Sequence, residues 1–164
     1  SWALVIAIML VYMIMAAQFE SLLTPFVIMF TVPLGFIGVI AGLLAFGRTL
    51  SVPSLMGIMI LTGIVVNNAI VMIDYINRLR KRGMAFQEAI IEGAAVRVRP
   101  ILVTAITTIL GMLPMALSHT EGAELRSPMA IAVASGLLFS TFLTLFVIPI
   151  AYSIANRVSY KRKR

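Results

Sequence analysis

The chain has 164 residues, of which 61% are hydrophobic and 12% are charged, and its formal net charge is +7. A mean hydropathy of +1.07 lies far above that of soluble domains, which excludes an ordinary water-soluble fold and indicates a membrane protein. The absence of cysteine excludes disulfides, thiolate metal sites and cysteine nucleophiles. In so apolar a chain, an excess of Lys and Arg suits contact with anionic lipid headgroups. We therefore expect membrane lipids, not nucleic acid, as partners.

Five apolar runs bounded by polar residues predict an all-α fold, a polytopic transmembrane helix bundle of five spans. In chain order the runs cover about residues 2–17, 25–46, 55–76, 101–117 and 129–155. The second run, with about 22 residues at about 1.5 Å rise per residue, is about 33 Å long, close to the ~30 Å hydrocarbon core. The first run is short and the sequence opens on Ser1 and Trp2, so we interpret residues 1–164 as the C-terminal part of a longer protein.

Basic residues fix the expected orientation, because Lys and Arg in short loops stay on the cytoplasmic side. Apart from Arg48 and Arg126, every Lys and Arg falls between the third and fourth runs or after the fifth. We therefore expect a multi-pass protein of the cytoplasmic membrane, with its N-terminal end outside and its C-terminal tail in the cytoplasm.

The segment between the third and fourth runs has apolar residues at helical spacing beside Glu88 and Glu92. This pattern predicts a short amphipathic helix over about 84–96 on the cytoplasmic surface, which joins two spans. A regulatory or lipid-sensing role for it is the alternative.

Small residues and prolines shape the expected spans. Gly38 and Gly42 have the spacing that lets another helix approach closely. Pro33 and Pro114 each remove a backbone hydrogen bond and should kink the second and fourth spans. Ser127 followed by a proline fits an N-cap, which predicts that the last span begins there.

Two adjacent amides, Asn67 and Asn68, lie near the middle of the third run, where an unpartnered amide costs roughly 2 to 7 kcal/mol. At about 100° per residue, Gly63, Asn67 and Asp74 share one helix face, and Asn68 lies beside it. Asp74 is about 12 Å nearer the cytoplasm than the amides. No carboxylate or Lys lies at mid-membrane depth in the five runs, so any proton-carrying acid must come from elsewhere.

In the fourth run, Thr104, Thr107, Thr108 and Gly111 form a second small, polar face. One interpretation is that the two faces only join helices through hydrogen bonds worth about 0.6 kcal/mol each, or that the threonines bond their own helix. The other is that they belong to an ion or substrate pathway, as polar groups deep in a membrane commonly do.

An ordered series of motifs gives the chain a specific resemblance. The motifs are QFES at 18–21, VPLGFIG at 32–38, GIVVNNAIVMIDYIN at 63–77, RVRPILVT at 97–104 and GMLP at 111–114. Together they resemble the resistance-nodulation-division (RND) transporters, specifically the acriflavine-resistance-like permeases of the hydrophobe/amphiphile efflux branch. The resemblance implies that these are the last five of twelve spans, and that a large extracytoplasmic domain precedes residue 1.

The resemblance also implies an activity and partners. The chain would be part of a secondary active transporter, not an enzyme, that exports compounds by drug/proton antiport, driven by the proton-motive force across the inner membrane, as in multidrug resistance. Its partners would be the rest of the same transporter chain, two further copies in a homotrimer, a periplasmic adaptor and an outer-membrane channel. No cofactor, metal site or substrate-binding residue is expected in this part, and the coupling ion is expected to be the proton.

Matching positions imply the site residues. Asn67 stands where well-studied members carry a Lys, Asn68 keeps the family's Asn, and Thr104 keeps the Thr of the proton relay. Arg97 is a basic residue where the family has one, at the cytoplasmic entrance of the relay. Asp74 is added to the expected relay residues because it lies on the same polar face of the third span.

Two other functional classes are the alternatives. A channel subunit could use the same polar faces to line a pore, and a structural membrane anchor could use them only for packing. An intramembrane protease is excluded, because neither HExxH nor GxSxG occurs.

Overall fold

Long apolar runs form helices because a helix satisfies its own backbone hydrogen bonds, as the hydrocarbon core of a membrane requires. The computed structural model describes residues 2–20 and 22–161, and these residues form six helices and no strand. The helices are α1 (Trp2–Phe19), α2 (Leu23–Met29), α3 (Thr31–Ala45), α4 (Val52–Lys81), α5 (Phe86–Ala116) and α6 (Ala123–Lys161). The predicted all-α fold is confirmed.

Four segments of the described chain are long and apolar enough to cross a membrane. They are Leu23–Ala45, Val52–Lys81, Phe86–Ala116 and Ala123–Ile154. The apolar segment Val5–Phe19 of α1 is shorter, so the first of the five expected spans stays a prediction.

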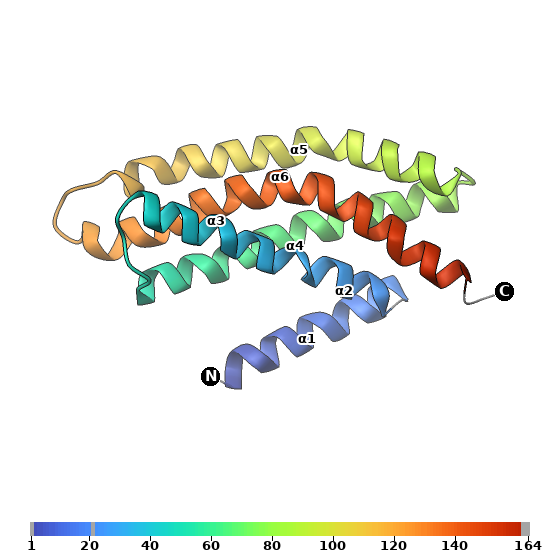
Figure 1. Cartoon of the computed structure of the whole chain (residues 1–164), viewed down its shortest axis with the longest axis horizontal. Coiled ribbons are helices and arrows are strands. Elements are labelled where there is room, and N and C mark those ends of the chain that lie inside the picture. Colours follow the sequence, from blue (N-terminus) through green and yellow to red (C-terminus); the bar gives the residue numbers. More distant parts are fainter. Residues whose placement is uncertain (1, 21, 162–164) are drawn as a thin grey trace.

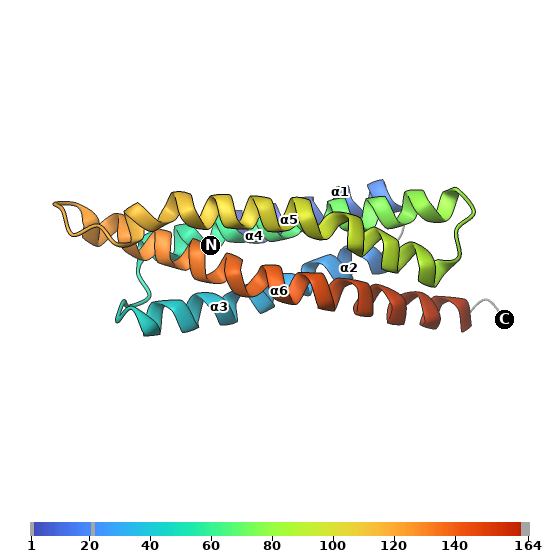
Figure 2. The same cartoon turned by 90° about the horizontal axis from the view of Figure 1, so that it is seen from above.

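Helix α6 occupies the centre of the bundle and packs along α3, α4 and α5. Figures 1 and 2 show these four helices running lengthwise beside one another, while α1 lies at one edge and packs against α2. The turn between α4 and α5 and the end of α6 lie at the same end of the bundle (Figure 1). The basic residues of the α4–α5 turn and the described end of α6 therefore lie at one end of the bundle, and we refer to it as the basic end.

Buried side chains within the described residues form two apolar clusters, one in each half of the bundle. The cluster nearer the basic end includes Met72, Ile73, Ile76, Ile148 and Tyr152. The other includes Val39, Leu43, Leu61, Ala130 and Leu137.

The close packing expected at Gly38 and Gly42 is present between α3 and α6. A Cβ atom added at Gly38 would overlap the Phe139 side chain, and one added at Gly42 would overlap Ser135. The two backbones approach this closely because both positions of α3 lack side chains.

The kink expected from Pro33 appears about one turn earlier, as a break between α2 and α3 at Phe30. Pro33 has no N–H to donate to the carbonyl of Met29, so the helix loses a bond at that point. The Thr31 hydroxyl donates to the carbonyl of Ile28 at 2.6 Å beside the break. Helix α5 continues through Pro114 to Ala116, so no break appears at this proline.

The amphipathic segment expected over about 84–96 differs from the prediction, because it is the first part of α5 and continues without a break into the fourth apolar run. Ala89, Ile90 and Gly93 are buried there. A Cβ atom added at Gly93 would overlap Ile76 of α4, so the segment packs into the bundle. The helix continues unbroken through Pro100.

Helix α6 begins at Ala123, not at the N-cap predicted at Ser127. The buried Ser127 hydroxyl instead donates to the carbonyl of Ala116 at 2.8 Å. That carbonyl belongs to the last turn of α5 and has no partner within its own helix. Ser127 therefore caps the end of the preceding helix.

Candidate functional site

The predicted site residues lie on α4 and α5. Asn67 and Asp74 are seven residues apart, about two turns, so both lie on the outer face of α4. Asn67 is exposed in this chain, and Asp74 forms an ion pair with Arg78 in which Oδ2 lies 2.9 Å from Nε. Because the Arg78 side chain is 70% exposed, this pair adds little stability.

Asn68, Arg97 and Thr104 belong to the seam between α4 and α5. The guanidinium of Arg97 lies over the ring of Tyr75, 5.0 Å from the ring centroid. The two helices are antiparallel, as Figure 1 shows. Asn68 precedes Tyr75 by seven residues and Thr104 follows Arg97 by seven, so both lie about 10.5 Å from this contact in the same direction. Helix geometry thus brings Asn68 and Thr104 to the same seam at about the same depth.

Asn67, Asn68 and Thr104 lack side-chain hydrogen bonds to other helices of the described chain. The Thr104 hydroxyl donates to the carbonyl of Pro100 on its own helix at 3.0 Å. Among the described residues, neither the Asn67 nor the Asn68 amide takes part in a hydrogen bond. Asn68 is half-buried, which places it at the edge of the packed surface.

Arg97 is also incompletely satisfied. Its Nε atom is buried, yet it has no hydrogen-bond partner among the described residues. The contact with Tyr75 is a cation–π interaction, which stabilises the charge but supplies no acceptor. The arrangement leaves one buried donor of Arg97 unsatisfied among the described residues.

Helix α5 is the least covered of the four long apolar segments. In the most apolar 18-residue stretch of α5, 11% is buried inside the bundle. In the corresponding stretches of the other three segments, 44% to 50% is buried. Its exposed surface has a small, polar stripe and an apolar stripe at helical spacing. The first contains Pro100, Thr104, Thr107 and Gly111, and the second contains Val103, Ile106, Leu110 and Leu113.

Two glycines continue this open polar surface across both helices. Apart from the chain neighbours and the helix's own backbone, no described atom lies within 4 Å of a Cβ atom added at Gly63 on α4 or at Gly111 on α5. Glycines at exposed positions of a membrane helix allow another helix to approach the backbone closely. The open polar face, defined as Gly63, Asn67, Thr104, Thr107 and Gly111, is thus shaped to receive a further helix.

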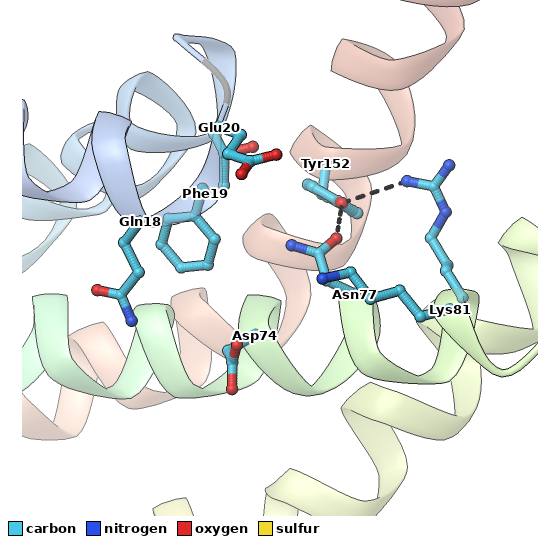
Figure 3. A pocket seen from close by; sticks show the side chains of 9 residues that line it. Gln18, Phe19, Glu20, Asp74, Asn77, Lys81 and Tyr152 are labelled. Atoms are coloured by element: carbon cyan, nitrogen blue, oxygen red, sulfur yellow. Dashed lines mark hydrogen bonds between the residues drawn. The ribbon is translucent and has the colours of Figure 1, made fainter.

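A second polar group joins three helices at the basic end, and sequence analysis missed it. The Tyr152 hydroxyl of α6 donates to Oδ1 of Asn77 on α4 and accepts from Arg80 at 3.5 Å (Figure 3). The Arg80 guanidinium lies 4.8 Å from the ring centroid of Phe86 on α5, and that ring contacts Tyr152. These residues are up to 75 positions apart, so no local pattern could indicate the group.

A cavity of about 500 Å³ adjoins this group, lined by residues of α1, α2, α4 and α6 and by Glu20. Asp74 also lines it, and Figure 3 shows its carboxylate directed away from Asn77 and Tyr152. Within the described part of the chain, no three His, Cys, Asp or Glu side chains are grouped to hold a metal ion.

Comparisons with known proteins identify the family of the chain. Residues 1–156 match the model of the AcrB/AcrD/AcrF family. The chain is also similar to crystal structures of a heavy metal efflux pump. For one crystal form the TM-score is 0.85 and the identity 35%, over 94% of this chain and 16% of that one. For another crystal form the TM-score is 0.74 and the identity 37%, over 88% of this chain and 15% of that one. This chain therefore spans about one sixth of those pumps, and it belongs to the AcrB/AcrD/AcrF family of RND permeases.

Proposed function

We propose that the chain is the C-terminal membrane part of an efflux transporter that uses the proton-motive force across the cytoplasmic membrane. Family membership and four apolar segments of spanning length support this assignment. The similar solved structures are several times longer than this chain, so substrate capture is assigned to the rest of the protein.

The observation that carries the proposal is the exposed Asn67 amide at mid-membrane depth on the open polar face. An amide left in hydrocarbon without a partner costs roughly 2 to 7 kcal/mol, so this face is covered by protein or lines water. The buried Ser127 hydroxyl inside the bundle, by contrast, is satisfied by a backbone carbonyl. The open polar face is therefore reserved for a partner outside this chain.

The proposed partner is a span with acidic side chains in the first half of the same transporter. This chain has no carboxylate at the depth of Asn67, so a proton carried there needs an acid from elsewhere. Asn68 and Thr104, on one seam, would donate hydrogen bonds to that acid when it is ionised and release it when it is protonated. Asn67 would provide an uncharged contact where well-studied relatives use a Lys.

Arg97 and Asp74 are assigned to the cytoplasmic entrance of this relay. Arg97 lies about two turns from Thr104, and its positive charge would attract an anionic group or water near the path. Asp74, paired with Arg78, lies closer to the basic end, on the cytoplasmic side of the proposed relay.

The proposed cargo is a hydrophobic or amphiphilic compound, as the motifs of that branch imply. A heavy-metal cargo is the second candidate, because the similar solved structures are of a heavy metal efflux pump. A homotrimer with a periplasmic adaptor and an outer-membrane channel is proposed on the same family basis. Survival of a pump-deficient host on detergents and dyes, or on metal salts, distinguishes the two cargoes.

The relay is tested in the full-length transporter, expressed in a host that lacks its own efflux pumps. Asn68→Ala and Thr104→Ala should abolish export and export-linked proton uptake, while both proteins insert and fold normally. Thr62→Ala is the matched control, because the Thr62 hydroxyl bonds its own helix at the Ile58 carbonyl (2.8 Å) on another side of α4. Normal export by both relay variants would refute the proposal. Export that persists without a proton gradient would favour a channel.

A further inference from the structure

The cavity at the basic end is lined by side chains of both charges. Glu20 and Asp74 are acidic, and Arg80 and Lys81 are basic. Its volume of about 500 Å³ falls within the range of about 300–1,000 Å³ typical of small-molecule sites. A cavity with this lining suits a ligand that carries both a negative and a positive group.

Two of the four charges already have partners. Asp74 is paired with Arg78 at 2.9 Å, and Arg80 lies over Phe86 and contacts the Tyr152 hydroxyl. Within the described residues, Lys81 and Glu20 form no ion pair. Among the described residues, the cavity therefore presents one cation without an ion pair on α4 and one such anion after α1, and Figure 3 shows Glu20 and Lys81 on these separate segments.

The backbone at Glu20 adds an independent observation. Its φ of +49° lies in the left-handed region, and it is the only described residue other than glycine with a positive φ. Glu20 directly follows α1, at a position where helices usually place Gly or Asn. An acidic side chain is thus kept at the cavity rim against a backbone preference, as is common at ligand-binding positions.

Depth in the membrane identifies the ligand. Counted from Val66 near the midpoint of the third apolar run, Asp74 is about 12 Å, Asn77 about 16 Å and Lys81 about 22 Å toward the basic end. The hydrocarbon core ends about 15 Å from the centre, and the headgroup layer ends about 20–22 Å from it. The cavity therefore lies at the level of lipid phosphates and headgroups.

We propose that this cavity binds the headgroup of a phospholipid with a primary ammonium group, such as phosphatidylethanolamine, from the cytoplasmic leaflet. The phosphate accepts hydrogen bonds from Lys81 and from the free N–H groups of Arg80. The ammonium donates to the Glu20 carboxylate. Phosphatidylcholine cannot donate these hydrogen bonds, and phosphatidylglycerol has no positive charge for Glu20.

The proposal does not depend on proton coupling. It uses the free charges Lys81 and Glu20, neither of which belongs to the proposed relay. Lipid retention and export are separate measurements, so failure of one assignment leaves the other in place.

The test is native mass spectrometry of the full-length transporter, delipidated and then exposed to equal amounts of phosphatidylethanolamine, phosphatidylcholine and phosphatidylglycerol in mixed micelles. The wild type should retain phosphatidylethanolamine in preference to both others. Lys81→Gln should lower its retention about fivefold, the effect of about 1 kcal/mol expected for one basic residue at the membrane surface. Arg82→Gln is the matched control, because Arg82 is the next residue, equally basic, and lies outside the cavity lining.

Glu20→Gly tests the ammonium contact with little risk to folding, since glycine suits the positive φ at this position. This variant should keep its thermal stability and lose the preference for phosphatidylethanolamine over phosphatidylcholine. Equal retention in Lys81→Gln, Glu20→Gly and Arg82→Gln would overturn the proposal. Displacement of the lipid by equimolar glycerophosphoethanolamine or inorganic phosphate would also overturn it, because the site would then take a soluble phosphate.

Discussion

The Arg97 guanidinium lies 5.0 Å from the centroid of the Tyr75 ring and joins α5 to α4 two turns from Thr104. A partly desolvated contact of this kind contributes about 0.5–2 kcal/mol. Tyr75→Leu removes the aromatic face, so this variant and Arg97→Gln should show a coupling of about that size in a double-mutant cycle of thermal unfolding of the full transporter. Tyr75→Phe retains the face and should retain most of the coupling. Additive effects of the two substitutions would contradict the contact.

The Tyr152 hydroxyl joins α6 to α4 through Asn77 and Arg80. Tyr152→Phe keeps the ring contact with Phe86 but leaves the Asn77 carbonyl oxygen without its donor. We expect a loss of about 1–3 kcal/mol in the free energy of unfolding. Tyr12→Phe is the control, because the Tyr12 hydroxyl bonds the Leu22 carbonyl in an exposed place and its loss should cost less. Thermal or denaturant unfolding in detergent measures both, and equal losses would argue against the buried link.

The contact of α3 with α6 depends on the missing side chain at Gly42. A valine there would overlap Ser135, and overpacking of this kind costs about 1–3 kcal/mol or more. Gly42→Val should therefore lower the unfolding temperature of the transporter and its level in the membrane. Ala41→Val places the same side chain at the exposed neighbouring position and should change neither. If the two variants behave alike, the helices are not in close contact at Gly42.

Periodicity and composition were sufficient for the all-α fold, because in a membrane an apolar run of spanning length has few alternatives to a helix. The ends and breaks of the helices were harder to predict from the sequence. Pro33 predicted a kink, but the break falls at Phe30, since the bond that proline removes belongs to the preceding turn. The amphipathic pattern predicted a surface helix over about 84–96 separate from the fourth span, yet α5 is continuous and Gly93 packs on Ile76.

The candidate site could be predicted from the sequence only in part. Helical spacing put Asn67 and Asp74 on one face, and the structure shows that face uncovered in this chain. The contact of Arg97 with Tyr75, which places Asn68 and Thr104 on one seam, needs the register of two helices. Register is set by packing, so no local pattern contains it.

The start of α6 shows the same limit and gives a further test. Ser127 has the sequence of an N-cap, but its buried hydroxyl binds the Ala116 carbonyl across the loop. Ser127→Ala leaves that carbonyl unsatisfied and should cost about 1–3 kcal/mol of unfolding free energy. Ser118→Ala, which removes only a local bond to the Met115 carbonyl, should cost less. A loss no greater than that of Ser118→Ala would mean that the link between α5 and α6 contributes nothing.

The two stripes of α5 should differ in their contact with water if the open polar face belongs to a proton relay. The chain contains no cysteine, so single cysteines can be introduced into a transporter whose other cysteines have been replaced. Cysteine at Thr104 or Thr107 should react with small, water-soluble thiol reagents, since a thiol must ionise to react and therefore needs water.

Cysteine at Val103 or Ile106, on the apolar stripe, should resist the same reagents, because hydrocarbon disfavours the thiolate. Dissipating the proton gradient should change the reaction rates on the polar stripe and leave those on the apolar stripe unaltered. Equal reactivity of the two stripes would mean that both face the same medium. In that case the threonines would serve packing alone, and the relay would have to lie on another surface of the transporter.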